Sequence, residues 1–326
     1  MDAALTIDAR ALWAGEEPLG QALAFVDLDA TREAPDEPVL PPCPVIGLGA
    51  RDHPFAHHLD AIIEPPVTAQ ALARQVLAMP GPAAVIVQLL RFLPQLEPEA
   101  GLAAESLAYG LLQGSEAHRE WIGARSSASP VARGGKVELL RDGEQLLIAL
   151  DRPECGNVID RTMRDALYEG FSLAANDPAI RRVVLRGRGR TFCLGADLDE
   201  FGTTRDPATA HAIRARTLPA RALLRCADRL EAHVQGACVG AGLEIAAFAR
   251  RLTAASDAWF QLPELAMGIL PGAGGCVSLS RRIGRQRAAL LILSGKRLSA
   301  RQALGWGLID GIMDEPPGDE CGADQA

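Results

Sequence analysis

Strand-like and helix-like segments alternate through the second half of the chain, from Lys136 onward. The runs 137–140 and 145–150 are apolar and lie on either side of Asp142-Gly143. An Asp-Gly pair between two apolar runs is typical of a β-hairpin. Residues 160–174 then carry apolar side chains at helical spacing and are expected to form the next helix. Strands that alternate with helices predict a layered α/β core.

The same alternation continues toward the C-terminus. We expect strands at residues 182–186, 232–235 and 251–254, and one long helix at residues 208–226. A Gly-rich segment between the last two strands is expected to begin a further helix. The tail, residues 314–326, is polar and rich in Gly and Pro, and is expected to be flexible.

The first half of the chain has a different pattern. Residues 1–58 contain a run of prolines and are expected to be irregular, with one short strand at residues 45–49. Residues 59–130 are expected to be helical, because apolar side chains recur there at helical spacing and prolines divide the segment into separate helices. We expect those helices at 68–79, 80–93 and 105–125, with Ser115 as an N-cap, followed by a linker up to Gly135.

Composition excludes several classes of protein. The hydrophobic fraction of 48% is enough for a large buried core. The net charge of -8 argues against a general nucleic-acid-binding protein, and the longest apolar runs are too short to cross a membrane. The chain has seven cysteines without a CxxC pair, and its N-terminus lacks a basic and apolar leader. We therefore expect a reduced, cytoplasmic protein.

Four segments in the second half carry most of the chemical information. They are residues 151–158, 191–198, 234–244 and 263–275. Each alone is a weak signal, but the four in this order and spacing resemble the enoyl-CoA hydratase/isomerase (crotonase) superfamily. The resemblance implies a crotonase-type α/β spiral of ββα units in residues 135–313. It also implies a lyase that acts on coenzyme-A thioesters.

Two Gly-rich turns are suited to stabilising an oxyanion. Reaction beside a thioester carbonyl builds negative charge on the carbonyl oxygen, and two converging backbone N–H groups can stabilise that charge. The small residues of Gly195-Ala196-Asp197 and Gly240-Ala241-Gly242 would let a thioester approach the backbone. Either turn alone would be read as a tight packing turn. The resemblance implies that the N–H groups of Ala196 and Ala241 are the two donors.

Two glutamates complete the predicted catalytic set. Glu244 follows Ala241 by one helical turn, and Glu264 precedes Leu270-Pro271-Gly272. The resemblance implies that Glu244 acts on water and that Glu264 protonates the α-carbon. Because an isomerase can work with only the second position acidic, the two carboxylates favour a hydratase. The alternatives are an isomerase, another enolate-type hydrolase or lyase, and a non-catalytic acyl-CoA-binding scaffold.

The resemblance also implies a binding surface and an assembly. The coenzyme A part of the substrate is expected to contact Val158, Leu194, Ala196, Asp197, Leu198, Pro271 and Gly272. No other cofactor is expected. The partner is an acyl-CoA thioester, with neither nucleic acid nor membrane, and the chain is expected to form a homo-oligomer, either a trimer or a hexamer.

Other chemically active side chains fit plainer roles. His53, His57 and His58 lie near Asp52 and Asp60, but a Pro-rich loop with solvated histidines explains them better than a metal site. We therefore expect no metal. Cys193 and Cys238 are expected to pack as small apolar side chains. The basic run 281–287 is expected either to interact with a helix dipole or to bind coenzyme A phosphates.

The order of segments along the chain is unusual for the family. The family continues with several helices after a segment like Gly307–Asp310, whereas this sequence has only a polar tail there. Residues 59–66 echo residues 309–317 with one insertion, and the helices expected in 68–125 match the missing ones in order. Two interpretations stay open. Either the chain is partly duplicated or permuted, or residues 59–130 are an unrelated helical appendage with a chance repeat.

Overall fold

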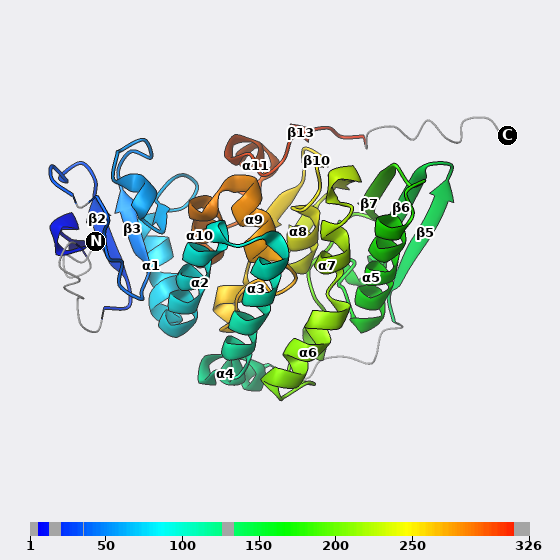
Figure 1. Cartoon of the computed structure of the whole chain (residues 1–326), viewed down its shortest axis with the longest axis horizontal. Helices are drawn as coiled ribbons and strands as arrows, with labels where there is room; N and C mark the ends of the chain where they lie inside the picture. The colour runs from blue at the N-terminus through cyan, green and yellow to red at the C-terminus, as the bar shows by residue number, and fades with distance from the viewer. Residues whose placement is uncertain (1–5, 13–20, 35, 126–133, 316–326) are drawn as a thin grey trace. The chain divides into compact units, whose positions relative to one another are not determined.

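The computed structural model describes residues 6–12, 21–34, 36–125 and 134–315 (Figure 1). The chain divides into two compact units, each made of segments that are separated in the sequence. The first unit contains Met1–Ala128, Phe201–Arg216 and Leu262–Lys296, and the second contains Ser129–Glu200, Thr217–Gln261 and Arg297–Ala326. Most of the expected linker and most of the expected tail lie outside the described residues.

The second unit is built on a six-stranded sheet with the order β13-β10-β8-β7-β6-β5. Its strands are β5 (Lys136–Asp142), β6 (Gln145–Asp151), β7 (Arg182–Gly187), β8 (Leu230–Val234), β10 (Arg251–Ala254) and β13 (Gly311–Ile312). β5 and β6 pair antiparallel around Asp142-Gly143, so the predicted hairpin is confirmed. The other pairs are parallel, and helix α5 (Arg161–Asn176) packs on the β5–β6 end (Figure 1).

A second, three-stranded sheet in the same unit has the order β12-β11-β9. Its strands are β9 (Ala237–Val239), β11 (Trp259–Gln261) and β12 (Leu298–Ser299). Helix α8 (Ala241–Ala246) follows β9, and α11 (Ala300–Trp306) follows β12. The predicted α/β core is therefore confirmed, although these strands are too short for a periodic pattern to reveal them.

The long helix predicted at residues 208–226 is wrong. The structure has two helices there, α6 (Pro207–Thr217) and α7 (Pro219–Leu224). Leu218 is extended (φ -67°, ψ 117°), because a residue before proline is pushed out of the helical region and Pro219 has no N–H to continue the helix. The boundary between the two compact units also falls at this point, after Arg216.

The described residues among the first 58 contain regular strands, which corrects the prediction of an irregular segment there. They contribute three strands to a parallel sheet of β1 (Thr6–Ile7), β2 (Ala24–Asp27), β3 (Val45–Leu48) and β4 (Ala61–Ile62). Only β3 was predicted. The residues of β2 and β3 are nearly all buried, so these strands are almost continuously apolar. They therefore lack the alternation of apolar and polar residues that usually reveals a strand in a sequence.

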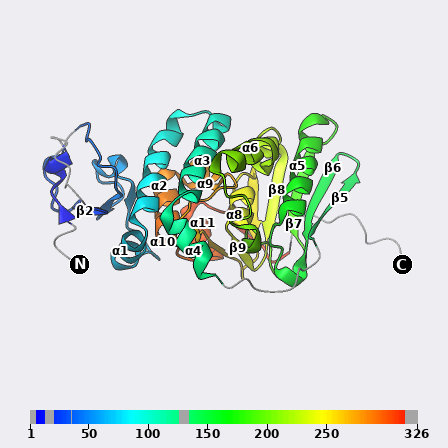
Figure 2. The same ribbon diagram turned by 90° about the horizontal axis from the view of Figure 1, so that it is seen from below.

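The predicted helices of residues 68–125 are present in the first unit. They are α1 (Ala69–Ala78), α2 (Pro80–Phe92), α3 (Pro98–Gln113) and α4 (Glu116–Ala124), and Ser115 caps α4 as expected. α1, α2 and α3 pack with α9 (Gly275–Ile283) or α10 (Arg285–Ser294), beside which they lie in Figure 2, and α4 packs on α3 and η8. Among the described residues no single helix could cross a bilayer; α1 and Pro80–Gln95 reach that length and hydropathy together, but with a bend of 109°.

The short 3₁₀ helices complete the element list. They are η2 (Ala9–Leu12), η3 (Ala56–His58), η4 (Leu93–Gln95), η5 (Pro153–Cys155), η6 (Leu198–Glu200), η7 (Ala227–Arg229) and η8 (Glu264–Met267). Of these, η6 and η8 carry residues that the sequence places at the active site.

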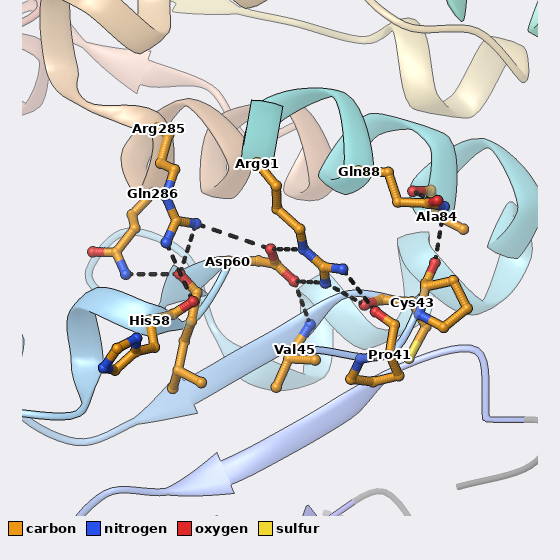
Figure 3. A network of polar contacts seen from close by, with 12 residues as sticks. Pro41, Cys43, Val45, His58, Asp60, Ala84, Gln88, Arg91, Arg285 and Gln286 are labelled. Atoms are coloured by element: carbon orange, nitrogen blue, oxygen red, sulfur yellow. Dashed lines mark hydrogen bonds and ion pairs between the residues drawn. The ribbon is translucent and has the colours of Figure 1, made fainter. Parts of the chain in front are cut away.

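A buried carboxylate joins the small parallel sheet to α2 (Figure 3). Asp60 is 2% exposed and accepts hydrogen bonds from Arg91 Nε and Nη2, at 2.8 and 2.6 Å, and from the Val45 N–H at 2.8 Å. Arg91 also donates to the carbonyl oxygens of Pro41 and Cys43. Asp60 therefore forms an ion pair with Arg91 and does not form a cluster with the nearby histidines.

The basic run at the start of α10 binds the same region. Arg285 donates to the carbonyl oxygens of His57 and Leu59, and Arg287 pairs with Glu64 at 2.8 Å. The sequence left two roles open for this run, a helix dipole or coenzyme A phosphates. For Arg285 and Arg287 the structure shows a third role, because their hydrogen bonds hold residues 57–64 against α10.

Candidate active site

In the second unit, residues 193–197 run between two neighbouring segments. On one side, the Cys193 N–H donates to the Ala237 carbonyl at 3.0 Å, and the Val239 N–H donates to the Cys193 carbonyl at 2.9 Å. On the other side, the Ile159 N–H donates to the Gly195 carbonyl at 2.8 Å. These bonds fix the first predicted oxyanion turn from both sides.

The hydrogen bonds to Ile159 determine where the Ala196 N–H points. The Gly195 carbonyl belongs to the same peptide group as the Ala196 N–H, and a trans peptide directs these two groups in opposite directions. Because the Gly195 carbonyl is aimed at Ile159, the Ala196 N–H is aimed away from it. In the described part of the chain, no protein acceptor receives that N–H.

The second predicted turn lies directly beside the first. A Cβ atom added to Gly195 would stand 3.3 Å from the Val239 carbonyl oxygen and 3.8 Å from the Ala241 nitrogen, so only glycine fits closely, and its φ of +100° also requires glycine. Ala241 begins α8, and the first N–H groups of a helix have no partner within that helix. The structure therefore brings Ala196 and Ala241 to one corner of the second unit.

Cys193 and Cys238 are fully buried behind these turns and pair through an isolated β-bridge. A Cβ atom on Gly242 would lie 2.5 Å from Cys193 Cβ, so the thiol side chain fills the space under α8. Burial raises the pKa of the Cys193 thiol to about 12 and raises that of Cys238 as well. Both thiols stay protonated at neutral pH, which suits packing and not nucleophilic catalysis.

Glu244 is on α8, one turn after Ala241. It is 2% exposed, and its backbone N–H donates to the Gly240 carbonyl at 2.9 Å. Leu243 and Ile245 beside it are also buried. Glu244 is therefore not the solvated helix residue that its polarity alone would suggest.

Glu264 is in the first unit, at the start of η8, and is 7% exposed. The alternative of a plain surface carboxylate is therefore wrong. His118 of α4 donates from Nδ1 to the Met267 carbonyl at 2.8 Å, which ties η8 to α4. Burial lowers the pKa of His118, so the ring is neutral at pH 7. The two glutamates thus belong to different compact units.

The residues expected to contact coenzyme A differ in exposure. In the second unit, Val158 is half-buried and Leu194 is 43% exposed, while Asp197 pairs with the buried Arg152 at 2.8 Å. Leu198, also half-buried, begins η6. In the first unit, Pro271 is buried, and a Cβ atom on Gly272 would overlap the ring of Tyr109.

Comparison with known proteins identifies the family. The family described as enoyl-CoA hydratase/isomerase matches residues 143–317, which is more than half of the chain. This chain belongs to the enoyl-CoA hydratase/isomerase family. The matched region contains both glutamates and both Gly-rich turns, and the prediction of an enzyme of this family is confirmed.

Individual members of the enoyl-CoA hydratase/isomerase family resemble the second half of the chain. It is 35% identical to the 2,3-dehydroadipyl-CoA hydratase of Escherichia coli (strain K12), over 53% of this chain and 67% of that protein. It is 33% identical to the mevalonyl-coenzyme A hydratase of Beauveria bassiana (strain ARSEF 2860), over 52% of this chain and 64% of that protein. The chain thus spans about two thirds of the length of these relatives.

A solved structure confirms the crotonase-type fold. An enoyl-CoA hydratase/isomerase of Mycobacterium abscessus is 34% identical and superimposes with a TM-score of 0.52, over 55% of this chain and 71% of that one. The enoyl-CoA hydratase/isomerase family therefore accounts for the second half of the sequence, as its motifs indicated.

Sequence reasoning missed one carboxylate that organises the Pro271–Gly275 turn. Glu105 of α3 is 1% exposed and accepts hydrogen bonds from the N–H groups of Gly274 and Cys276, both at 2.8 Å. A carboxylate at a helix N-terminus is stabilised by the unpaired N–H groups and the helix dipole. The available signal was a lone acidic residue on the otherwise apolar face of α3.

Proposed function

We propose that this protein is an enoyl-CoA hydratase that adds water across the α,β-double bond of an acyl-CoA thioester. The observation that carries the proposal is the adjacent placement of Ala196 and Ala241, with the buried Glu244 one turn farther along α8. Two N–H groups in one corner are suited to binding the thioester oxygen and stabilising its charge as the enolate forms.

The two carboxylates would divide the proton transfers. Glu244 takes a proton from water as the water oxygen bonds to the β-carbon, and the electrons of the double bond move onto the thioester oxygen. Glu264, protonated, then gives its proton to the α-carbon, and the thioester carbonyl re-forms. Both carboxylates are buried, so each is placed to exchange a proton with the bound substrate or its water rather than with bulk solvent.

The relatives support hydration over the alternatives. The two curated proteins named above are both hydratases of coenzyme A thioesters. Retention of both acidic positions also favours a hydratase over an isomerase. Contacts to the coenzyme A part would come from the seven residues predicted for it, with no further cofactor.

We also propose that helices α1–α4 are part of the catalytic domain and are not an independent domain. The support is that α3 holds the start of α9 through Glu105, while residues 57–64 are bound by Arg285 and Arg287 of α10. A homo-oligomeric assembly and a cytoplasmic location complete the proposal. Both rest on the sequence and its resemblance to the family.

Turnover of defined thioesters by the full-length protein tests the function. Loss of the conjugated enoyl absorbance of crotonyl-CoA, and of longer and aromatic 2-enoyl-CoAs, reports hydration, and product analysis must show the 3-hydroxyacyl thioester. Conversion of a 3-enoyl-CoA to a 2-enoyl-CoA without hydration would instead establish an isomerase. Binding of these thioesters without any turnover would establish a scaffold.

A further inference from the structure

One residue in the first of the four family motifs has an unusual backbone. Asn157 has a φ of +55°, and it is the one non-glycine residue at positive φ in the described part of the chain. L-residues rarely adopt this region, and asparagine is among the few that tolerate it. Such a conformation persists where the surrounding contacts fix it, and it occurs often at functional sites. Asn157 is also 0% exposed, so neither solvent nor a ligand touches its side chain.

The side-chain amide of Asn157 joins two loops of the second unit. Its Oδ1 accepts from the Arg152 N–H, in the loop after β6, at 2.9 Å. Its Nδ2 donates to three carbonyl oxygens in the loop after β7, those of Arg188 and Thr191 at 2.8 Å and that of Phe192 at 3.1 Å. A carboxylate of the same size could not make this set of bonds, because it cannot donate to the carbonyl oxygens.

Further contacts connect Asn157 to the first predicted oxyanion turn. Cys193 Sγ donates to the Asn157 carbonyl at 3.1 Å, and the Gly195 N–H donates to the same sulfur at 3.3 Å. The thiol is able to donate because burial raises its pKa to about 12 and keeps it protonated. The Ile159 N–H in turn donates to the Gly195 carbonyl at 2.8 Å. The peptide that carries the Ala196 N–H is therefore held on one side by Asn157 and Ile159.

The other side of this turn is held without Asn157. The Cys193 N–H donates to the Ala237 carbonyl, and the Val239 N–H donates to the Cys193 carbonyl. These backbone bonds would remain if the Asn157 amide were removed. Loss of the amide should therefore let the turn shift while the second unit stays folded. A shift of ~1 Å in a group that binds the reacting atoms is enough to slow a reaction by ~10²-fold.

We propose that Asn157 is a positioning residue, whose buried amide sets the direction of the Ala196 N–H without contacting the substrate. The inference rests on the proposed hydratase function, because it requires Ala196 to donate to the thioester oxygen. Without the amide, that donor would be misaligned and the thioester carbonyl would be less polarised. The loss would appear mainly in kcat, because the hydrogen bond to the oxygen strengthens as negative charge develops there.

The kinetic test uses Asn157→Asp and Asn157→Gly in the full-length protein. Aspartate keeps the size of the side chain and the acceptor for the Arg152 N–H, but it cannot donate to the three carbonyl oxygens. Glycine removes the amide and adopts positive φ without strain. In both variants we expect kcat for crotonyl-CoA to fall by ~10- to 10²-fold, while KM stays within about 3-fold of wild type.

A spectroscopic test reads the carbonyl directly. Butyryl-CoA labelled with ¹³C at its carbonyl carbon has no double bond to hydrate, so the bound thioester persists during the measurement. The infrared stretching frequency of a carbonyl group falls as hydrogen bonds to its oxygen strengthen. Binding to the wild type should lower this frequency, and binding to Asn157→Gly should lower it less.

Two controls separate positioning from stability. Asn176→Asp makes the aspartate change at an exposed asparagine of the same unit. Leu167→Ala destabilises the second unit by leaving a cavity at a buried position of α5. Both should keep the wild-type kcat and carbonyl frequency below their unfolding temperatures. Asn157 variants that unfold at a lower temperature, yet keep the wild-type kcat and frequency, would overturn the inference, because the amide would then be only structural.

The inference stays testable if neither Asn157 variant folds. Cys193→Ala removes the sulfur that links the Asn157 carbonyl to the Gly195 N–H, and it should lower kcat and the carbonyl shift. Wild-type values in Cys193→Ala would then overturn the inference. If the wild type hydrates no enoyl-CoA, the hydratase function fails. The carbonyl frequency alone then decides on Asn157, since equal frequencies in wild type and Asn157→Gly would overturn its role.

Discussion

Asp60 and Asp310 make the same hydrogen bonds in two different sheets. Asp60 Oδ2 accepts from the Val45 N–H at 2.8 Å, and the Asp60 N–H donates to the Val45 carbonyl at 2.9 Å. Asp310 Oδ2 accepts from the Leu252 N–H at 2.7 Å, and its N–H donates to the Leu252 carbonyl at 2.7 Å. Each aspartate thus ties the start of an edge strand to the neighbouring parallel strand.

The correspondence extends along both strands. The Ile63 N–H donates to the Gly47 carbonyl at 3.0 Å, as the Met313 N–H donates to the Ala254 carbonyl at 2.8 Å. The strand order β2-β3-β4 matches β8-β10-β13, and all of these pairs are parallel. This shared pattern favours a partial duplication over a chance repeat of a short motif. In the described residues, long helices follow β4 and none follows β13.

The two equivalent aspartates should differ in their contribution to stability. Asp60 is buried and also pairs with Arg91, whereas Asp310 is exposed. Asparagine keeps an oxygen for the backbone N–H but removes the charge. Asp60→Asn should therefore lower the free energy of unfolding by about 3 kcal/mol, because it leaves Arg91 without its anion. Asp310→Asn should cost about 1 kcal/mol or less. Equal losses in urea unfolding would contradict this account of Asp60.

Glu105 should stabilise the start of α9. In Glu105→Gln the amide group keeps one acceptor, but its NH₂ faces backbone N–H groups that need acceptors. We expect a loss of about 1–3 kcal/mol in the free energy of unfolding. Glu120→Gln, on the exposed side of α4, is the matched control and should stay within about 0.5 kcal/mol of wild type. A Glu105→Gln protein as stable as this control would show that the cap is unimportant.

Removal of residues 1–130 should disable the protein. Helices α1–α3 pack with α9 and α10, and without them the apolar faces of those two helices would be exposed. We expect an aggregating, inactive product, because exposed apolar patches of that kind drive association. Light scattering and the hydration assay measure both properties. A truncated protein that is soluble, unfolds cooperatively and turns over at the wild-type rate would show that the first half is an accessory domain.

The Ala241 N–H should matter for turnover more than for folding. Ala241 is the first residue of α8, a position where proline is well tolerated, but proline has no N–H. Ala241→Pro should therefore fold and lose about 3 kcal/mol of transition-state stabilisation, which corresponds to about 10²-fold in kcat. Ala241→Gly retains the N–H and is the control. Wild-type kcat in a folded Ala241→Pro protein would remove Ala241 from the oxyanion site.

The sequence predicted the elements that have strong local signals. The Asp142-Gly143 turn predicted the hairpin, and Ser115 marked a helix start that the structure confirms by its side-chain hydrogen bond. The family was predicted because four motifs keep a fixed order. Strands such as β2 and β9 were missed, since segments of three or four residues that are nearly all buried carry no period of two.

Long-range polar partners could not be predicted from the sequence. The pairing of Glu105 with α9, and that of Asp60 with Arg91, join residues far apart in the chain, and no local spacing records them. The single helix predicted at residues 208–226 ignored Pro219, because the segments on both sides of this proline have a helical pattern. In the structure one helix ends before Pro219 and another begins with it.

The most direct test of the central claim is the hydration rate of Glu244→Gln and Glu264→Gln, measured with the best 2-enoyl-CoA substrate. Each variant should bind the thioester with nearly wild-type affinity and lose at least ~10²-fold in kcat, because each lacks one half of the acid/base pair. The double variant should lose much less than the product of the two single effects, as expected for groups that act as a unit. Wild-type turnover in either single variant would contradict the two-glutamate mechanism.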